Sequence, residues 1–284
     1  MSFNYQEFTT RNIGFVNEKE QLLLKNATVF IPGVGGMGGI VAACLARSGV
    51  ENFIIADMDE FEVSNLNRQI FANLNSVGKS KAETTKEELQ LINPNIKITL
   101  YNETWVNHLE DILPQVDVVV NGCDDSLSTV KLMRKCKVHG IHAVDAFAAT
   151  LPNVYVIRAE DPRPEEVFKY PTFGIPDESL TKEIASGCLI KEIEHVAVHS
   201  SSLNYIDLTV AQEIMEGKRS RVSFAPMVWT TGCMMSYEAI RTILKKPGGP
   251  SVKGLFFNVW TGKIEKPKNF LIAALRRLLV KKYL

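Results

Sequence analysis

The sequence lacks several features that mark specialised classes of protein. It has no excess of either charge, because 32 Lys and Arg residues balance 32 Asp and Glu residues. A neutral chain does not present the broad basic surface typical of nucleic-acid-binding proteins, so we expect no DNA partner. It has no apolar run long enough to cross a bilayer and no apolar core in its polar N-terminal segment. We therefore expect no transmembrane segment, no secretory signal and a cytoplasmic location.

Cysteine is scarce, and its spacing excludes the usual metal and disulfide frameworks. The five cysteines are scattered, with no C-x-x-C pair, at Cys44, Cys123, Cys136, Cys188 and Cys233. The sequence therefore has no zinc-ribbon signature and no pattern of paired disulfides. His195 and His199 stand four residues apart but lack the Glu that follows the first His of a zinc protease. We expect these histidines to be solvated or hydrogen-bonded.

What the sequence does contain is an alternation of apolar runs and helical patterns up to about residue 150. Apolar runs, rather than alternating apolar and polar residues, predict parallel strands that are buried on both faces. The fold class is therefore α/β: a Rossmann-like, mainly parallel sheet with helices on both faces. The predicted strands are 27–32, 52–57, 96–101, 117–121 and 141–147, and the predicted helices are 36–48, 80–91 and 127–138.

The rest of the chain is less regular. A polar, Pro-containing stretch covers 161–187, and no flexible linker separates the two parts. We interpret 1–150 as an N-terminal helix plus a nucleotide-binding domain, and 151–284 as a continuation that does not fold independently. In this continuation we expect a strand at 154–158, helices at 203–216 and 227–244, a hairpin at 255–264 and a basic last helix from 269.

A glycine-rich turn follows the first predicted strand. Gly33, Gly35, Gly36 and Gly38 permit a tight turn and a close approach of backbone N–H groups to phosphate at a helix N-terminus. Asp57 ends the second strand, where a carboxylate can accept hydrogen bonds from ribose hydroxyls. A glycine turn followed by such an aspartate can bind NAD, FAD or ATP, so a dehydrogenase would show the same pattern.

The next residues favour a triphosphate. Asn65, Arg68 and Gln69 lie close together, and Lys81 stands at the start of a predicted helix. A dinucleotide site needs no such cations, whereas a departing pyrophosphate does, because charge develops on it. Asp124 follows the apolar run 118–120 at the carboxyl end of a strand, where a carboxylate can hold Mg²⁺.

The ordered pattern GxGGxG, DxDxxxxSNLNRQ, GxxKA and a strand leading into a DD pair resembles the ThiF/MoeB/HesA family, bacterial relatives of the ubiquitin-activating enzymes. The resemblance covers roughly residues 5–150. It implies an enzyme, usually a dimer, that binds Mg-ATP and adenylates a carboxylate. In the family this is often the C-terminal glycine of a sulfur-carrier or ubiquitin-like protein.

The resemblance also implies roles for individual residues in nucleotide binding. Asp57 resembles the ribose-binding acid of the family. Asn65 and Arg68 resemble polar contacts to the phosphates, and Asp59 and Gln69 belong to the same nucleotide-binding segment.

A second set of residues would act in catalysis. Lys81 resembles the lysine that stabilises the transition state, and Asp124 the magnesium-binding aspartate. The segment 10–13 resembles the family's R-Q-[IL] segment, with Asn12 in place of Gln, so Arg11 would act on the ATP of the partner subunit.

The sequence departs from the family in its cysteines. Many relatives carry two C-x-x-C pairs that bind zinc; this chain has none, so we expect no zinc. Cys188, in a Gly-flanked segment, is either a nucleophile on an exposed turn or a structural cysteine. Cys233 lies in an apolar helical pattern and is predicted to be in the core.

Two rival functions remain from the residues alone. A nicotinamide-dependent oxidoreductase would explain the glycines and Asp57 but not the SNLNRQ segment or Lys81. A non-catalytic scaffold would keep the fold without needing the phosphate-binding cations. The acyl substrate stays open among a carrier-protein tail, a peptide and a modified tRNA base, and residues 151–284 are expected to bind it and to form a homodimer.

Overall fold

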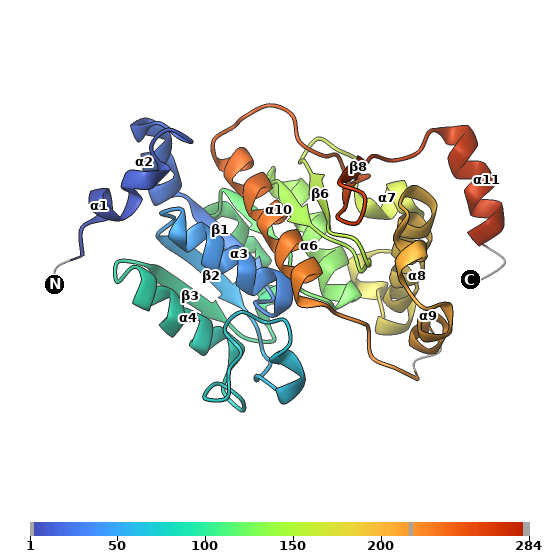
Figure 1. Ribbon diagram of the computed structural model, residues 1–284, viewed down its shortest axis with the longest axis horizontal. Helices are drawn as coiled ribbons and strands as arrows, with labels where there is room; N and C mark the ends of the chain where they lie inside the picture. Colours follow the sequence, from blue (N-terminus) through green and yellow to red (C-terminus); the bar gives the residue numbers. More distant parts are fainter. Residues whose placement is uncertain (1–2, 216–217, 281–284) are drawn as a thin grey trace.

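The computed structural model describes residues 3–215 and 218–280. Figure 1 labels its elements along the chain. The strands are β1 (Thr28–Pro32), β2 (Asn52–Ala56), β3 (Lys97–Tyr101), β4 (Val118–Val120), β5 (Ala143–Asp145), β6 (Asn153–Ile157), β7 (Leu255–Asn258) and β8 (Lys263–Glu265). The helices are α1 (Tyr5–Thr9), α2 (Glu18–Asn26), α3 (Gly36–Arg47), α4 (Lys81–Ile92), α5 (Leu109–Ile112), α6 (Ser126–His139), α7 (Pro164–Phe168), α8 (Lys182–His199), α9 (Leu208–Met215), α10 (Ala225–Ile243) and α11 (Phe270–Val280).

In the described residues the strands form one sheet in the order β3-β2-β1-β4-β5-β6-β7-β8. The first five in this order pair in parallel, and β6 to β8 add to the edge in antiparallel fashion. The strand order reverses between β1 and β4. In open α/β sheets, ligands bind beyond the carboxyl ends of the strands at such a reversal, so the topology alone places a candidate site there.

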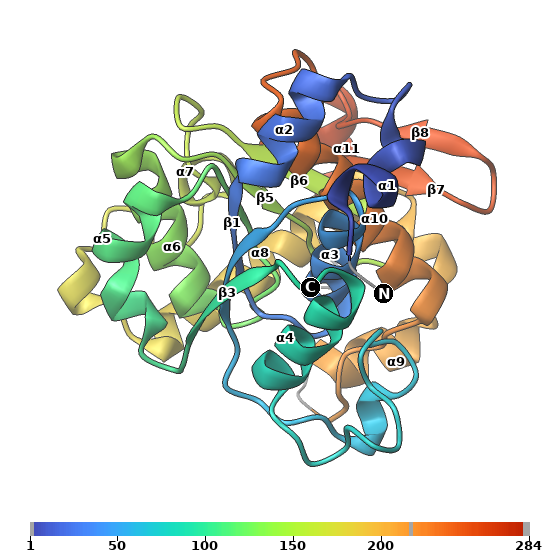
Figure 2. The same cartoon turned by 90° about the vertical axis from the view of Figure 1, so that its left-hand side faces the viewer.

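Successive residues of the central strands feed two separate cores, which explains their continuous apolar runs. Val29 and Ile31 of β1 pack in the cluster under α3, α4 and α10, whereas Phe30 packs in the opposite cluster with residues of α5 and α6. Figure 2 shows α5 and α6 on one side of the strands and α3, α4 and α10 on the other. The prediction of a mainly parallel sheet covered on both faces is confirmed.

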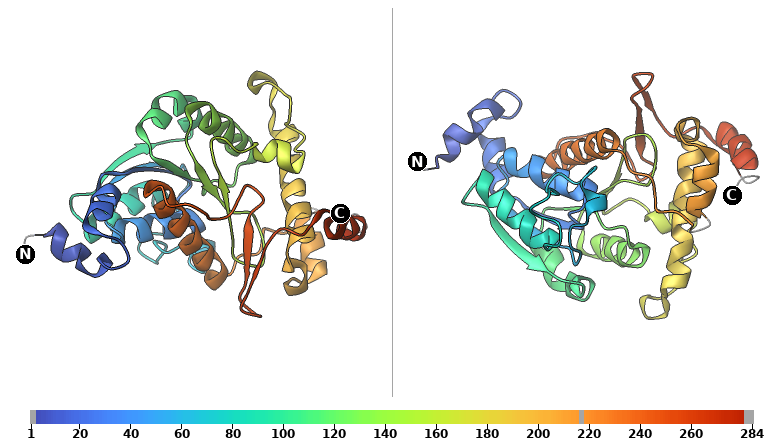
Figure 3. Two further views of the ribbon diagram at one scale, coloured as in Figure 1. Left: turned by 90° about the horizontal axis from the view of Figure 1, so that it is seen from above. Right: turned by 60° about the horizontal axis from the view of Figure 1, so that its bottom comes forward.

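The C-terminal half of the chain extends the sheet of the N-terminal half and packs against its helices. The strand β6 continues the same sheet, and α10 returns across it to lie beside α3 (Figures 1 and 3). The two helices approach so closely that a Cβ atom at Gly232 would stand 2.6 Å from the Cβ of Ile40. Arg134 of α6 further ties in the segment after β6, donating to Glu165 Oε1 at 2.7 Å and pairing with Asp177.

The largest departure from prediction is α8, an eighteen-residue helix where we expected only a polar stretch to residue 187. It begins at the N-cap Thr181 and packs on α6 and α11. The predicted helix 203–216 begins later, at Leu208, as α9, and its residue 216 lies outside the described part. The last predicted helix is described only to Val280, so its final four residues lie outside it too. Within the described residues no helix is long and apolar enough to cross a membrane.

Candidate functional site

The glycine turn after β1 packs directly against the end of β4. Gly33 has a φ of +81°, and a Cβ atom there would stand 2.4 Å from the carbonyl oxygen of Gly122. A Cβ atom at Gly38 would stand 1.9 Å from the carbonyl oxygen of Gly33. Only glycine fits either position, so the glycines bring the N-terminus of α3 to the point where the strand order reverses.

The first turn of α3 remains available for a ligand. No side chain caps this helix, so amide groups of its first turn can donate to an anion. Asp57 holds the turn in place, because its Oδ2 accepts from the backbone N–H of Val34 at 2.8 Å and its Oδ1 from that of Asp59 at 3.0 Å. Burial raises the pKa of Asp57. Its role in fixing the turn was not expected from the sequence.

The polar segment after β2 lies along one wall of the site. Asn65 is buried, with its Oδ1 accepting from the backbone N–H of Glu62 at 3.1 Å. Gln69 is also buried, and its Oε1 has no hydrogen-bond partner among the described residues. The Arg68 guanidinium donates to the carbonyl of Ser64 at 2.8 Å. The segment therefore holds one buried acceptor and one cation that are only partly satisfied by the protein.

Two charged groups are already paired. The Nζ of Lys81 lies 2.8 Å from the Oδ2 of Asp59. The lysine side chain is only 10% exposed, whereas the aspartate side chain is 65% exposed. The helix α4, which begins at Lys81, thus points a nearly buried ammonium group at the site.

The two aspartates after β4 have different roles. Asp125 is the N-cap of α6 and accepts from the backbone N–H of Ser128 at 2.8 Å. Asp124 is exposed and makes no hydrogen bond or ion pair with the described residues. Burial raises the pKa of the neighbouring Cys123 to about 12, so its thiol stays protonated at neutral pH. Asp124 is therefore the carboxylate free to meet a ligand.

These residues converge on one cavity of about 2180 Å³. Such a volume exceeds the range of about 300–1,000 Å³ typical of small-molecule pockets, so it has room for a nucleotide and a second group. We call its first part the glycine-turn end, formed by Gly33, Gly35, Gly36, Asp57, Asp59, Asn65, Arg68, Gln69, Lys81 and Asp124. Arg11, Gly38 and Cys188 do not line it.

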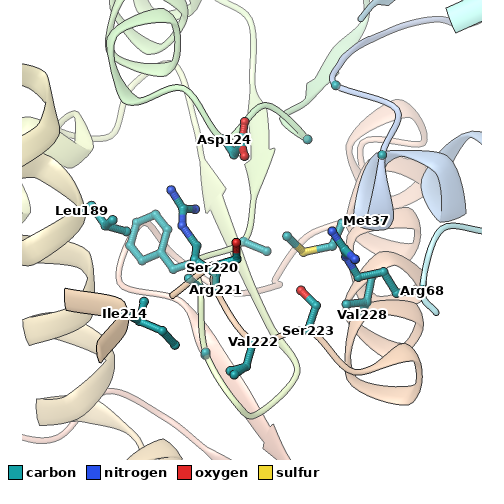
Figure 4. Close-up of a pocket in the computed structure, with 18 of the residues that line it drawn as sticks. Met37, Arg68, Asp124, Leu189, Ile214, Ser220, Arg221, Val222, Ser223 and Val228 are labelled. Atoms are coloured by element: carbon teal, nitrogen blue, oxygen red, sulfur yellow. The ribbon is translucent and has the colours of Figure 1, made fainter. Parts of the chain in front are cut away.

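The other part of the cavity contains charged residues that sequence analysis missed. We call it the carboxyl-pair end: Asp145 at the end of β5, Glu192 of α8, and Arg221 of the segment between α9 and α10. Figure 4 shows Arg221 inside the cavity between Arg68 on one side and Leu189 on the other. One available signal was that Asp145, like Asp57 and Asp124, comes at the carboxyl end of a strand. Glu192 and Arg221 carried no motif.

Both missed carboxyl groups hold protons more tightly than usual. Burial, followed by the nearby charge of Glu192, raises the pKa of Asp145 to about 8. Burial likewise raises the pKa of Glu192 to about 7, although its Oε1 accepts from the Tyr170 hydroxyl at 2.9 Å. These two groups titrate close to neutrality, as acid and base groups in active sites often do.

Cys188 corrects a premise of the sequence analysis. It lies within α8 rather than on an exposed turn, and it is fully buried. Burial raises the pKa of its thiol to about 11, and its Sγ lies 3.7 Å from the Oγ1 of Thr172. A neutral, buried thiol outside the cavity favours the structural alternative, because the thiolate is the nucleophile.

Cys233 was also misplaced, since it is exposed on α10 rather than in the core. Its Sγ lies 4.0 Å from that of Cys44 on α3. The two histidines are hydrogen-bonded, as expected: the Nε2 of His195 contacts the carbonyl of Lys253 at 3.0 Å, and the Nδ1 of His199 accepts from the N–H of Lys268 at 3.0 Å.

Comparison with known proteins now bears on this geometry. The ThiF family matches residues 9–271. The chain belongs to the ThiF family. A tRNA threonylcarbamoyladenosine dehydratase of Bacillus subtilis is 33% identical over 130 residues, which are 44% of this chain and 50% of the relative. Ubiquitin-like modifier-activating enzyme 5 of Caenorhabditis elegans is 38% identical over 108 residues, 35% of this chain and 25% of the relative. The chain thus spans half or less of these curated relatives.

Solved ThiF-type structures share the fold over a longer stretch. The microcin C7 biosynthetic enzyme MccB in complex with N-formylated MccA has a TM-score of 0.62 and 21% identity, over 93% of this chain and 69% of that one. The E. coli tRNA N6-threonylcarbamoyladenosine dehydratase has a TM-score of 0.62 and 19% identity, over 86% of this chain and 97% of that one. At these identities the likeness concerns the fold.

Proposed function

We propose that this ThiF-family protein binds Mg-ATP and adenylates a carboxylate, releasing pyrophosphate. One observation carries the proposal: Arg68, Lys81 and Asp124 come from three separate segments and converge on one cavity beside an uncapped helix N-terminus. A solved relative in fold, E. coli MccB, has been crystallised with ATP. The family membership and the cavity together support a nucleotide at the glycine-turn end.

The residues present fit ATP and Mg²⁺. The unpartnered Oε1 of Gln69 and the first-turn amides of α3 offer hydrogen bonds to the nucleotide. Mg²⁺ is commonly bound by one or two carboxylates together with substrate phosphates, which suits the free carboxylate of Asp124. In the described residues no group of three or more His, Cys, Asp or Glu side chains could hold a metal without such phosphates.

The cationic side chains of the glycine-turn end would then stabilise the negative charge that develops during the reaction. When bound, Mg²⁺ would offset the negative charge of the phosphates. Arg68 and Lys81 would stabilise the charge passing to pyrophosphate, and the pair with Asp59 keeps the Lys81 ammonium in place before the reaction. The substrate carboxylate needs no general base for its attack on the α-phosphate, because it is already ionised at neutral pH.

Calorimetric titration with Mg-ATP and, separately, with NAD tests the proposal. We expect micromolar binding of Mg-ATP and none of NAD. Arg68→Ala should weaken ATP binding about tenfold or more, whereas the matched control Arg47→Ala, at the far end of α3, should not. Binding of NAD that is indifferent to Arg68 would instead favour the oxidoreductase. A scaffold would support no pyrophosphate exchange with any carboxylate tested.

A homodimer is part of the same proposal. Arg11 lies in a turn at residues 10–12, is exposed and does not line the cavity of its own chain. Several apolar side chains of this N-terminal region, among them Phe15 at 86% and Leu22 at 55%, are also exposed. If Arg11 acts on ATP, it does so in the cavity of a second copy.

Mixing two variants tests this role of Arg11. In a mixed dimer of Arg11→Ala and Arg68→Ala chains, one of the two sites has both arginines intact. Two inactive variants should therefore regain about a quarter of wild-type activity after subunit exchange. A mixture that stays inactive although light scattering shows dimers would contradict action in trans.

For the acyl substrate, we propose only its general class. The cavity continues from the glycine-turn end into walls contributed by α8 and the segment after α9. The structural relative MccB has been solved with the peptide N-formylated MccA, which favours a peptide or protein tail here. Residues 151–284 would supply its binding surface.

A further inference from the structure

The carboxyl-pair end contains two carboxyl groups that accept hydrogen bonds but have no ion-pair partner among the described residues. Asp145 is 5% exposed, Glu192 of α8 is half-buried, and both line the cavity. The Asp145 carboxylate accepts from Asn121 Nδ2 at 3.2 Å and from the N–H of Ala146 at 2.8 Å. Among the described residues, neither carboxyl group has a Lys, Arg or His nitrogen within ion-pair distance. Buried carboxylates without cations are costly.

A third polar group, which does not itself line the cavity, lies beside the pair. Tyr155 is fully buried, and its hydroxyl has no hydrogen-bond partner among the described residues. It stands directly opposite Asp145 in the register of β5 and β6, so the two side chains share one face of the sheet. The charges of both Glu192 and Asp145 act on this hydroxyl, which places it within electrostatic range of the pair.

The arginine of the carboxyl-pair end does not pair with these carboxyl groups. Arg221 acts on Glu192 only through its charge, and no hydrogen bond or ion pair joins the two. Apolar side chains close to the pair in sequence, among them Phe147, Leu189 and Ile193, also line the cavity. Two carboxyl groups that line one cavity and act on each other by charge resist ionising together, and a cation that enters would donate charge-assisted hydrogen bonds to each.

We propose that Asp145 and Glu192 form a binding site for a positively charged nitrogen of the acyl substrate, either an ammonium or a guanidinium group. The cation site depends on the proposed adenylation in one respect: the bound cation is taken to be part of the acyl substrate. The substrate class is then a carboxylate that also carries a cationic nitrogen, such as an amino acid or a peptide tail with a basic residue. A site built for such a group rejects analogues that lack it, because its buried carboxyl groups stay unpaired.

A simple probe tests the site without knowledge of the full substrate. The full chain, labelled with ¹³C at Asp and Glu carboxyl carbons, is titrated with n-butylammonium chloride. Size-matched 1-butanol and equimolar sodium chloride serve as controls, and Asp145→Asn and Glu192→Gln assign the two signals. We expect both signals to shift saturably in the millimolar range with butylammonium alone, and each variant to weaken binding about tenfold.

Either of two outcomes would overturn the proposal: equal effects of butylammonium and the controls, or unchanged binding in both variants. If one variant fails to fold, the other and the wild-type titration still decide. Mg-ATP calorimetry on the same samples distinguishes a failure of the cation site from a failure of the proposed adenylation. Binding of ATP without binding of butylammonium rejects the cation site alone. Binding of butylammonium without ATP rejects adenylation and leaves the cation site standing.

Discussion

The two ends of the cavity balance charge in opposite ways. At the glycine-turn end the nearly buried ammonium of Lys81 already has a partner in Asp59 at 2.8 Å. At the carboxyl-pair end, the charge of Glu192 acts on Asp145, and neither group has an ion pair among the described residues. Both have raised pKa values. At the first end the buried cation is already paired before a ligand arrives, whereas at the second end burial favours the protonated form of both carboxyl groups.

This difference shows which part of the site is general and which is particular. A phosphate site can be built from backbone amides and a few cations, because every nucleotide presents the same phosphates. A site for the acyl group must match one substrate, so its residues follow no general motif. The predictions below test each end, starting with the largest expected effect.

The glycine-turn end should depend on Gly38 for folding. In Gly38→Ala the new Cβ would stand 1.9 Å from the carbonyl oxygen of Gly33, so the turn must open. We expect a loss of about 3 kcal/mol or more in the free energy of unfolding. Gly36→Ala is the matched control, because its nearest neighbour is the end of the Val228 side chain, and it should change stability by less than about 1 kcal/mol. Equal losses in urea unfolding would show that the close approach is not the cause.

Lys81 should matter for the reaction more than for stability. Lys81→Ala leaves Asp59, which is largely exposed, without a partner, so thermal unfolding should change little. Pyrophosphate exchange, with whichever carboxylate a screen identifies, should fall about 10²–10³-fold. The control is Lys79→Ala, two residues away, exposed and outside the cavity. If both variants lose the same activity, Lys81 has no specific role.

The carboxyl-pair end should weaken the fold as pH rises. The pKa of Asp145 is about 8 in the folded chain and about 3.9 for an unfolded Asp. Between these values the folded chain keeps a proton that the unfolded chain releases, so stability falls with rising pH. Asp145→Asn removes this loss, and its Tm at pH 8 should exceed that of the wild type by a few degrees, at about 2–4 °C per kcal/mol.

Near pH 4 the advantage of Asp145→Asn should largely vanish, because the unfolded Asp, with a pKa of about 3.9, then holds its proton about half of the time. Differential scanning calorimetry at pH 4, 6 and 8 measures the trend. A wild-type Tm that is higher than that of the variant at pH 8 would mean that Asp145 is ionised and satisfied without a ligand.

Cys188 should have the smallest effect on activity. Because its thiol is buried and protonated, Cys188→Ala should change the rate of exchange or acyl transfer less than about twofold. Iodoacetamide should label the exposed Cys233 in the native chain and leave Cys188 unmodified, as mass spectrometry can show. Adenylation that persists while acyl transfer is lost in Cys188→Ala would restore the nucleophile hypothesis.

Sequence reasoning recovered the parallel sheet because apolar runs such as 29–31 must be buried on both faces. It also assembled the glycine-turn end, since ten of its predicted residues line one cavity. It failed at α8, whose even mixture of apolar and polar residues offers no clear stripe and follows a Pro-containing stretch. It misplaced Cys233 because an apolar helix does not reveal which of its sides faces the core.

What the sequence by itself determined was the local chemistry: a turn that only glycines can form, carboxylates at strand ends, and cations at fixed distances along the chain. The tertiary structure alone decided that Asp145 and Glu192 line one cavity and that Tyr155 stands opposite Asp145, because they come from two neighbouring strands and a helix far along the chain. It also decided which groups lack partners. Whether a buried carboxyl group has a cation beside it depends on the packing of segments far apart in the chain, and no spacing along the sequence records that.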